Sequence, residues 1–492
     1  MNTYVPQRNW WFALMFLLVA FPILGQNYRH IIEISERYYY EGRYYDAFDN
    51  IERGLRKVER KDKGLIYSEM LMYRMKYLVS LGIFDEFEAQ VIDALSLKKQ
   101  GGEHSMIYGK ALLDVSLAYL NYSDIQTALS YLEKAEAILK TNTDFHVKKG
   151  LEISRDSLKD HFIAYGIDYV KVKAGLLRGD FDKVQNTLPQ LIQHAAKCME
   201  DRGFRYNPAT NTFEEYKHSR YQLRRYKTAY AETLTFKAEL ERRRGNYPTA
   251  DSLFGQAENW ILKNGLGRNL AYIRNKHLQL VNLIEWGKDI SKAKNELERL
   301  IFLAEKKIGL VHEEYLKLHE TIIDYYITTR YSRKSRLQRW ELNTNTGLYY
   351  SEDRIQHTIA VRQDAKKDFY AKRYQDAQQR LIKEYANKKK VPDNHIERIK
   401  IVELLYQIAL KQDNLTDAKD YLVELRKLQN KILGSNSLSY HVSGMRLADF
   451  YLTYTNQFDS ARVLLQQSFD KNLKHRLDEF HKDYTYFLQE YA

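Results

Sequence analysis

The chain has 492 residues, a formal net charge of +13 and a mean hydropathy of −0.58. This polarity excludes a polytopic membrane protein, while a hydrophobic content of 44% is too high for wholesale disorder. With only 6 prolines and 22 glycines, the chain has few helix breakers, which favours helices. Basic residues alternate with acidic ones, so the excess positive charge forms no basic tail, and we expect no nucleic-acid partner.

The first 25 residues have the pattern of a signal peptide. Arg8 supplies a positive charge, and a nearly continuous apolar run of about 15 residues follows, from Trp10 to Leu24. This run is shorter than the roughly 20 residues that span a bilayer, and the small residue Gly25 suits a cleavage site. We therefore expect an exported protein, periplasmic or extracellular, that begins near Gln26. In the alternative, the segment stays uncleaved as an N-terminal membrane anchor, which is the one membrane contact we expect.

A short pattern then recurs along the chain. A polar turn with Gly or Asn comes before a small residue, and apolar residues follow at helical spacing. The pattern is clear at residues 42–47, 244–250 and 413–418, where the small residues are Ala47, Ala250 and Ala418. Such a pattern predicts a turn between two helices that approach each other closely.

The recurring pattern resembles the tetratricopeptide repeat, a helix–turn–helix unit of about 34 residues. The units begin near Tyr28, Ser68, Gly109, Tyr165, Ala231, Arg274, Thr358, Ile399 and Val442, and residues 309–340 look like a degenerate tenth unit. The last units are similar to the longer repeats of kinesin light chains. The resemblance implies an all-α fold, a right-handed superhelical solenoid of helical hairpins. Another helical-hairpin solenoid with longer repeats is the alternative.

Two stretches rich in Asn, Pro, Thr and Gly interrupt the array, at residues 201–218 and 341–357. Their flanking aromatic residues indicate exposed loops or short hairpins. They divide the chain into a signal peptide (1–25), N-terminal repeats (26–200), middle repeats (201–340) and C-terminal repeats (341–492). Residues 481–492 look like one more helix, either a terminal cap or the start of a longer architecture.

Motifs that carry chemistry are absent from the sequence. It has no glycine-rich phosphate loop, no H-E-x-x-H and no G-x-S-x-G. The single cysteine, Cys198, excludes an intramolecular disulfide and a zinc site with several thiolates. Two weak candidates remain, His312 with His319 as a metal pair and His194 with Cys198 as a thiolate–imidazolium couple, but both spacings are more typical of packing. We expect no enzyme activity, no cofactor and no metal.

The repeat surface is the remaining candidate for function. In tetratricopeptide arrays, the first helix of each unit lines the concave face. The resemblance places six residues of the late units there: Arg362, Lys366, Tyr370, Lys400, Gln407 and Lys411. This mainly basic groove, diluted by Glu403, suits an acidic segment or a C-terminal carboxylate. An ordinary charged surface without a ligand is the alternative.

The sequence therefore predicts a non-catalytic, exported scaffold that binds a partner protein or an acidic peptide through its repeat surface. A second hypothesis is a sensory or regulatory repeat module that acts with a separate signalling or peptidase partner. An enzyme with a site hidden between repeats is a third hypothesis.

Overall fold

A computed structural model describes residues 28–468, apart from gaps at 29, 42, 60–64, 82, 84–85, 100–102, 104–105, 149–156, 201–203, 208–211, 216–221, 268, 311, 329–354 and 389–390. The predicted signal peptide, the second insertion, the second half of the degenerate unit and the predicted last helix lie wholly or almost wholly outside the described residues.

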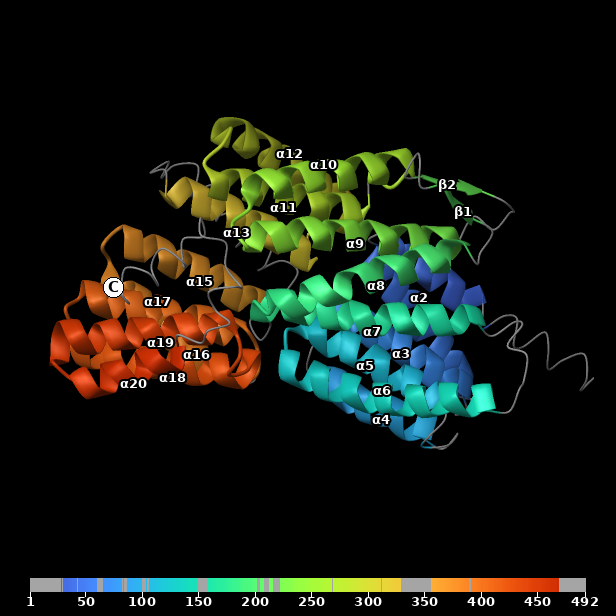
Figure 1. The fold of residues 1–492 in the computed structure, drawn as a ribbon, viewed down its shortest axis with the longest axis horizontal. Helices are drawn as coiled ribbons and strands as arrows, with labels where there is room; N and C mark the ends of the chain where they lie inside the picture. The colour runs from blue at the N-terminus through green and yellow to red at the C-terminus, as the bar shows by residue number, and fades with distance from the viewer. Residues whose placement is uncertain are drawn as a thin grey trace, which may run out of the picture.

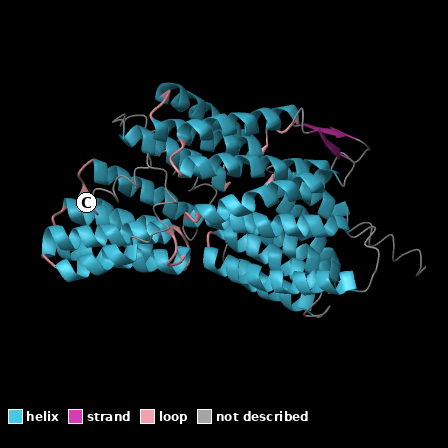
Figure 2. Cartoon of the chain, viewed as in Figure 1, coloured by secondary structure: helices cyan, strands magenta, loops and turns pink. Residues whose placement is uncertain are grey.

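The described part of the chain is almost entirely helical (Figure 2). A helix at residues 30–40 is followed by α2 (Tyr44–Glu59), α3 (Leu65–Leu81), α4 (Phe87–Lys99), α5 (Met106–Tyr122), α6 (Ile125–Lys148), α7 (Ser157–Arg178), α8 (Phe181–Glu200), α9 (Gln222–Arg243), α10 (Tyr247–Lys263), α11 (Leu270–Trp286), α12 (Ile290–Ile308), α13 (Glu313–Thr328), α15 (Ile355–Tyr370), α16 (Tyr374–Ala386), α17 (Glu397–Lys411), α18 (Leu415–Leu433), α19 (Leu438–Phe450) and α20 (Phe458–Ser468). The end of α19 continues as a π-helical turn, η1 (Tyr451–Thr455). Strands β1 (Phe204–Asn207) and β2 (Thr212–Glu215) pair antiparallel within the first insertion, so the short hairpin predicted there is confirmed.

Successive helices pack in pairs, each pair being one repeat unit. We call the first helix of a unit helix A (odd-numbered from α3 to α19) and the second helix B. The units are longer than the 34 residues of the tetratricopeptide repeat: α11, α13, α15, α17 and α19 begin at residues 270, 313, 355, 397 and 438, which are 43, 42, 42 and 41 residues apart. Both helices of a unit are therefore about four to five turns long.

The turn from helix A to helix B has the same backbone geometry in most units. One residue with positive φ ends helix A, and the next amide N–H bonds to the carbonyl five residues earlier, as in a Schellman motif. For example, Gly245 has a φ of 88°, and the Asn246 N–H lies 2.9 Å from the Glu241 carbonyl oxygen. The same bond is made by Asp124, Asp180, Lys288, Arg373 and Asn414. The polar Gly/Asn turns of the sequence produce this motif.

A fully buried small residue follows the turn in most units and lets helix B approach helix A, although Phe87 takes its place in the α3–α4 unit. The small residue is Ala47, Ala128, Ala250, Ala293, Ala377, Ala418 or Ala461. Val184 replaces it in the α7–α8 unit, and there helix A provides the space instead. A Cβ atom at Gly175 would lie 2.5 Å from Val184 Cγ2, so glycine compensates for the larger side chain.

Consecutive helices A contact one another from α3 to α17, whereas no pair of consecutive helices B in the described part of the chain makes a comparable contact. The array therefore curves with its helices A on the inside. Figure 1 shows the result as an arch, in which α9–α13 join the N-terminal helices α2–α8 to the C-terminal helices α15–α20.

The curvature brings the late units back against the early ones. An apolar cluster that begins in α2–α7 continues into α17–α19. At the α7–α8 turn, a Cβ atom on Gly179 would lie 2.6 Å from Leu438 Cβ at the start of α19. Near this point, Asn394 Nδ2 donates to Asp124 Oδ2 at 3.3 Å. Residues about 260 to 270 positions apart in sequence are thus packed together, and this contact helps to fix the curvature.

The chain is therefore an all-α solenoid of tetratricopeptide-like helical hairpins, and the predicted fold class is confirmed. Within the residues that the structure covers, no helix combines the length and the apolar character needed to cross a bilayer.

Candidate functional site: the inner face

Charged side chains from successive helices A form one continuous stripe on the inner face of the arch. We call this stripe the inner ladder. It consists of Glu232 (α9), Arg274 (α11), Glu314, Glu320 and Asp324 (α13), Arg362 and Lys366 (α15), Glu397, Lys400 and Glu403 (α17) and Arg446 (α19). Each ion pair between neighbouring helices joins one unit to the next, so the ladder runs from α9 to α19.

The early part of the ladder centres on Arg274. Its Nη1 lies 2.7 Å from Glu232 Oε1, and its Nε lies 3.5 Å from Glu314 Oε2. His277 Nδ1 lies 2.6 Å from Glu314 Oε1, while its Nε2 lies 2.9 Å from Thr321 Oγ1. Burial alone would raise the pKa of Glu314, but the hydrogen bond from His277 and nearby positive charges, including Arg274, hold that pKa well below its usual range. Glu314 is therefore a buried carboxylate that stays ionised.

The late part of the ladder centres on Arg362, whose side chain is only 8% exposed. Its guanidinium donates to Glu320 and Glu397. Lys400 Nζ lies 3.4 Å from Glu320 and 3.7 Å from Glu397, so α13 and α17 meet across α15. Burial opposes ionisation of Glu320, but Lys400 and Arg362 lower its pKa to about 2. Two cations and two carboxylates thus neutralise one another.

Two histidines position the buried carboxylates of the ladder. The backbone N–H of Glu314 donates to His312 Nδ1 at 2.9 Å, and the N–H of Glu397 donates to His395 Nδ1 at 3.1 Å. His312 also stacks on Tyr44, with ring centroids 4.7 Å apart. Burial lowers the pKa of both histidines to about 4, so each is neutral and can accept the bond. A His-x-Glu sequence at the start of helix A therefore holds the glutamate in place in both units.

Part of the inner face is open to solvent. Glu313 and Lys317 form an ion pair of 2.5 Å, and their side chains are 50% and 48% exposed. Across the face, on α7, Lys173 donates to Asn121 Oδ1 at 2.6 Å. Burial and the positive charge of Arg274 lower the pKa of Lys173 to about 8. The inner face is thus a polar, partly hydrated surface to which several units contribute.

The structure places the six residues of the predicted ligand site in two groups. Arg362, Lys366 and Lys400 belong to the ladder; Lys366 Nζ lies 2.7 Å from Asp324 Oδ1. The other three are Tyr370, which is 51% exposed at the end of α15, with Gln407 and Lys411, which are exposed near the end of α17. The first three cations already have carboxylate partners, so the uncompensated charge that the sequence suggests is confined to Lys411.

Sequence reasoning placed Glu403 on this face but missed Glu320, Asp324 and Glu397, the carboxylates that neutralise Arg362, Lys366 and Lys400. Their signal is present in the sequence, because opposite charges stand one unit apart. Glu232 and Arg274 are 42 residues apart, and the same spacing separates Glu320 from Arg362 and Asp324 from Lys366. Residues at equal positions of neighbouring helices A meet on the inner face, so this spacing predicts ion pairs once the unit length is known.

The weak chemical candidates of the sequence do not form the predicted pairs: His312 accepts a hydrogen bond from the Glu314 backbone N–H, and the others pack elsewhere. His319 is fully buried and packs on Tyr315, with centroids 4.5 Å apart. His194 Nδ1 lies 2.9 Å from Asp168 Oδ2, a partner the sequence did not reveal, while Cys198 is buried in an apolar cluster. Among the described residues, no group of three His, Cys, Asp or Glu side chains is arranged to hold a metal ion.

Neither the models of protein families nor the curated proteins include a match to this sequence. Among solved structures, a Rap protein complexed with competence and sporulation factor aligns with 90% of this chain and 99% of its own, at 10% identity and a TM-score of 0.49. Yeast Tom70 aligns with 95% of this chain and 96% of its own, at 11% identity and a TM-score of 0.40. A circular tandem repeat protein aligns with 91% of both chains, at 12% identity and a TM-score of 0.20. Similarities of this size assign no ligand or partner to this chain.

Proposed function

We propose that this chain is a non-catalytic, exported scaffold that binds a partner protein or peptide along its inner face. The observation that carries the proposal is the continuous polar stripe on helices A from α9 to α19. A solenoid needs apolar contacts between its units for stability, but it does not need a ladder of buried charges, because such pairs contribute little net stability. An extended polar surface built by several units suits an extended partner.

The contact point that we propose lies at the C-terminal ends of α15 and α17. There Tyr370 offers an exposed aromatic ring, and Gln407 and Lys411 are exposed. The carbonyl ends of the two helices add a partial negative charge, which Lys411 offsets. An acidic side chain of the partner would bind Lys411, while an apolar group beside it would cover the ring of Tyr370.

The test is in-cell crosslinking in the source organism, followed by affinity purification of the tagged chain. A Tyr370→Ala, Lys411→Glu double variant is compared with Lys292→Glu, which changes an exposed lysine on helix B α12. We expect a reproducible partner protein with the parent chain and with Lys292→Glu, and a loss of it with the double variant. If the parent chain recovers no partner, the scaffold role is wrong. Equal recovery with all three proteins would place the contact elsewhere.

A further inference from the structure

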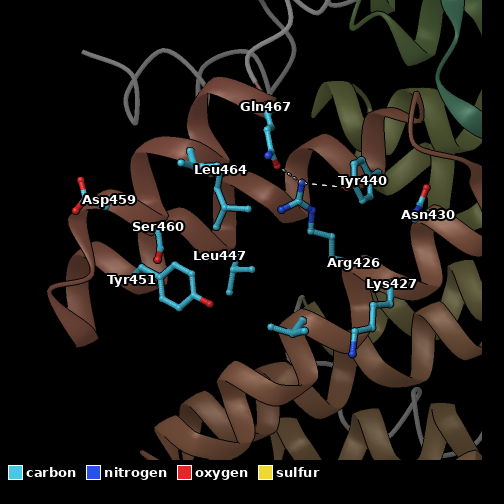
Figure 3. Close-up of a pocket in the computed structure, with 12 residues that line it drawn as sticks. Arg426, Lys427, Asn430, Tyr440, Leu447, Tyr451, Asp459, Ser460, Leu464 and Gln467 are labelled. Atoms are coloured by element: carbon cyan, nitrogen blue, oxygen red, sulfur yellow. Dashed lines mark hydrogen bonds between the residues drawn. The ribbon is translucent and has the colours of Figure 1, made fainter.

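A second surface, separate from the inner face, lies in the last described unit. It is a groove of about 670 Å³ between α18 and α20, with α19 and η1 as its floor (Figure 3), and we call it the terminal groove. Its walls are Val423, Arg426, Lys427 and Asn430 on one side and Asp459, Ser460, Val463, Leu464 and Gln467 on the other, and Tyr440, Leu447 and Tyr451 form the floor. The volume is that of a small-ligand or short-peptide site.

One end of the terminal groove holds a guanidinium without a carboxylate partner. Arg426 Nη2 donates to the Tyr440 hydroxyl at 3.1 Å and to Gln467 Oε1 at 3.4 Å, and its guanidinium lies 4.5 Å from the centre of the Tyr440 ring. These partners are neutral, whereas Arg362 and Arg274 in the inner ladder each hold two carboxylates. Among the described residues, no carboxylate lies within ion-pair distance of Arg426. A fixed guanidinium in this state favours an incoming carboxylate.

The other end of the groove is acidic, and its middle is apolar. Figure 3 shows Ser460 beside Tyr451 and Asp459 farther out, at the end away from Gln467. The Asp459 side chain is fully exposed, and its Oδ1 lies 4.0 Å from Nη2 of the exposed Arg462. Between the two ends lie apolar side chains of both walls and the floor, among them Leu447 and Val463, and Val463 is 46% exposed. The groove therefore has a positive end, an apolar middle and a negative end.

The dimensions of the groove select an extended ligand. Asp459 and Gln467 are eight residues apart on one helix, which corresponds to about 12 Å. An extended chain covers that distance with about four residues.

We propose that the terminal groove binds an extended segment of about four residues from a partner protein. The segment carries an acidic side chain at the Arg426 end, apolar side chains in the middle and a basic side chain at the Asp459 end. Alternate side chains of an extended segment point to opposite sides, so the apolar residues can contact both the α20 wall and the floor. This site does not depend on the inner face, and the two can be tested separately.

The test uses a defined probe, the fluorescein-labelled peptide Gly-Asp-Leu-Val-Lys-Gly with blocked ends, and fluorescence anisotropy up to millimolar protein. We expect saturable binding that weakens when Asn replaces the peptide's Asp, or when two Ser replace Leu-Val. Arg426→Gln is expected to weaken binding about tenfold or more, as for loss of a hydrogen bond to a charged group. Lys431→Gln, which removes an exposed cation on α18 that does not line the groove, is the matched control and should leave binding unchanged.

A charge exchange separates binding in the groove from damage to the fold. Arg426→Glu should abolish binding, and the Arg426→Glu, Asp459→Lys double variant should restore it, because an extended peptide can bind in the reverse direction. Thermal melts monitored by circular dichroism check that each variant is folded. No saturable binding to the parent chain, equal effects of Arg426→Gln and Lys431→Gln, or no restoration by the exchange would each overturn the proposal. A photocrosslinker at Leu464 that captures a second copy of this chain, rather than the peptide, would overturn it as well.

Discussion

The ion pairs of the inner ladder predict a large loss of stability when Arg362 is replaced. Its side chain is 8% exposed, and it pairs with Glu320, which is 15% exposed, and with Glu397, which is 2% exposed. Replacing Arg362 by Met keeps an unbranched apolar stem and removes the guanidinium with its charge. The two carboxylates are then left with Lys400 as their cation, at 3.4 and 3.7 Å. Removing one partner of a buried ion pair leaves a charge that neither water nor protein solvates well.

The expected loss in the free energy of unfolding follows from how deeply the ion pair is buried. Breaking a buried pair by removing one partner costs about 3–5 kcal/mol, whereas an exposed pair contributes about 0–1 kcal/mol. Arg362→Met should therefore lower the free energy of unfolding of this region by about 3–5 kcal/mol. Lys317→Met, which breaks the half-exposed pair with Glu313, should lower it by less than about 1 kcal/mol, because solvent screens that pair even though the pKa of Glu313 is lowered to about 2.

The assay must be local, because a repeat array does not unfold in a single two-state step. Native-state hydrogen exchange reports the opening free energy of individual helices. We expect Arg362→Met to increase exchange in α13, α15 and α17 and to leave α5 unchanged. Adding Glu397→Gln should recover part of the loss, because it removes one of the stranded charges. If Arg362→Met destabilises these helices no more than Lys317→Met does, the ladder is not a buried ion-pair network.

This prediction also bears on the ligand site inferred from the sequence. An Arg362→Glu, Lys366→Glu double variant would bring new carboxylates next to Glu320, Asp324 and Glu397. Repulsion among them would open α15 whether or not a ligand binds there. For this reason Tyr370 and Lys411 are the better positions for testing ligand binding on the inner face.

Three further outcomes are expected. His312 and His395 are buried and neutral, and burial lowers their pKa values to about 4, so unfolding takes up protons below their ordinary pKa of about 6.5. Each should reduce the opening free energy of its helix by about 1.4 kcal/mol per pH unit as pH falls from 6.5 toward 4. Native-state hydrogen exchange of α13 and α17, corrected for the intrinsic exchange rate, should show a flatter pH dependence of this free energy in the His312→Asn, His395→Asn double variant, while equal slopes would contradict this. Gly179→Ala should destabilise more than Gly287→Ala in thermal melts, because both glycines have positive φ but only at Gly179 would the new Cβ meet the late units; the reverse order would argue against the closing contact. N-terminal sequencing of exported protein should begin near Gln26, and an intact first methionine would refute cleavage.

The sequence alone was enough to predict the local structure of the helical hairpins. A polar turn followed by a small residue predicted most of the hairpins, because a left-handed turn residue and a close helix approach are steric requirements set by neighbours in the chain. Asn246 and Ala250 show this: the turn bond and the buried contact are made within a few residues. For the first insertion, the turn residues left an exposed loop and a short hairpin open, and the structure shows the hairpin.

The pairing of charges and the shape of the groove were decided by the tertiary structure. Arg362 and Lys400 look like free cations in the sequence, but both pair with Glu320 of α13, which is 42 and 80 residues away. The contact between Gly179 and Leu438 depends on small rotations between units that accumulate along the array. The terminal groove is a space left between α18, α19 and α20. The repeat pattern of the sequence does not predict it. Local sterics fix a helix and its turn, whereas the electrostatic state of a side chain depends on which other units the curvature brings within a few ångströms of it.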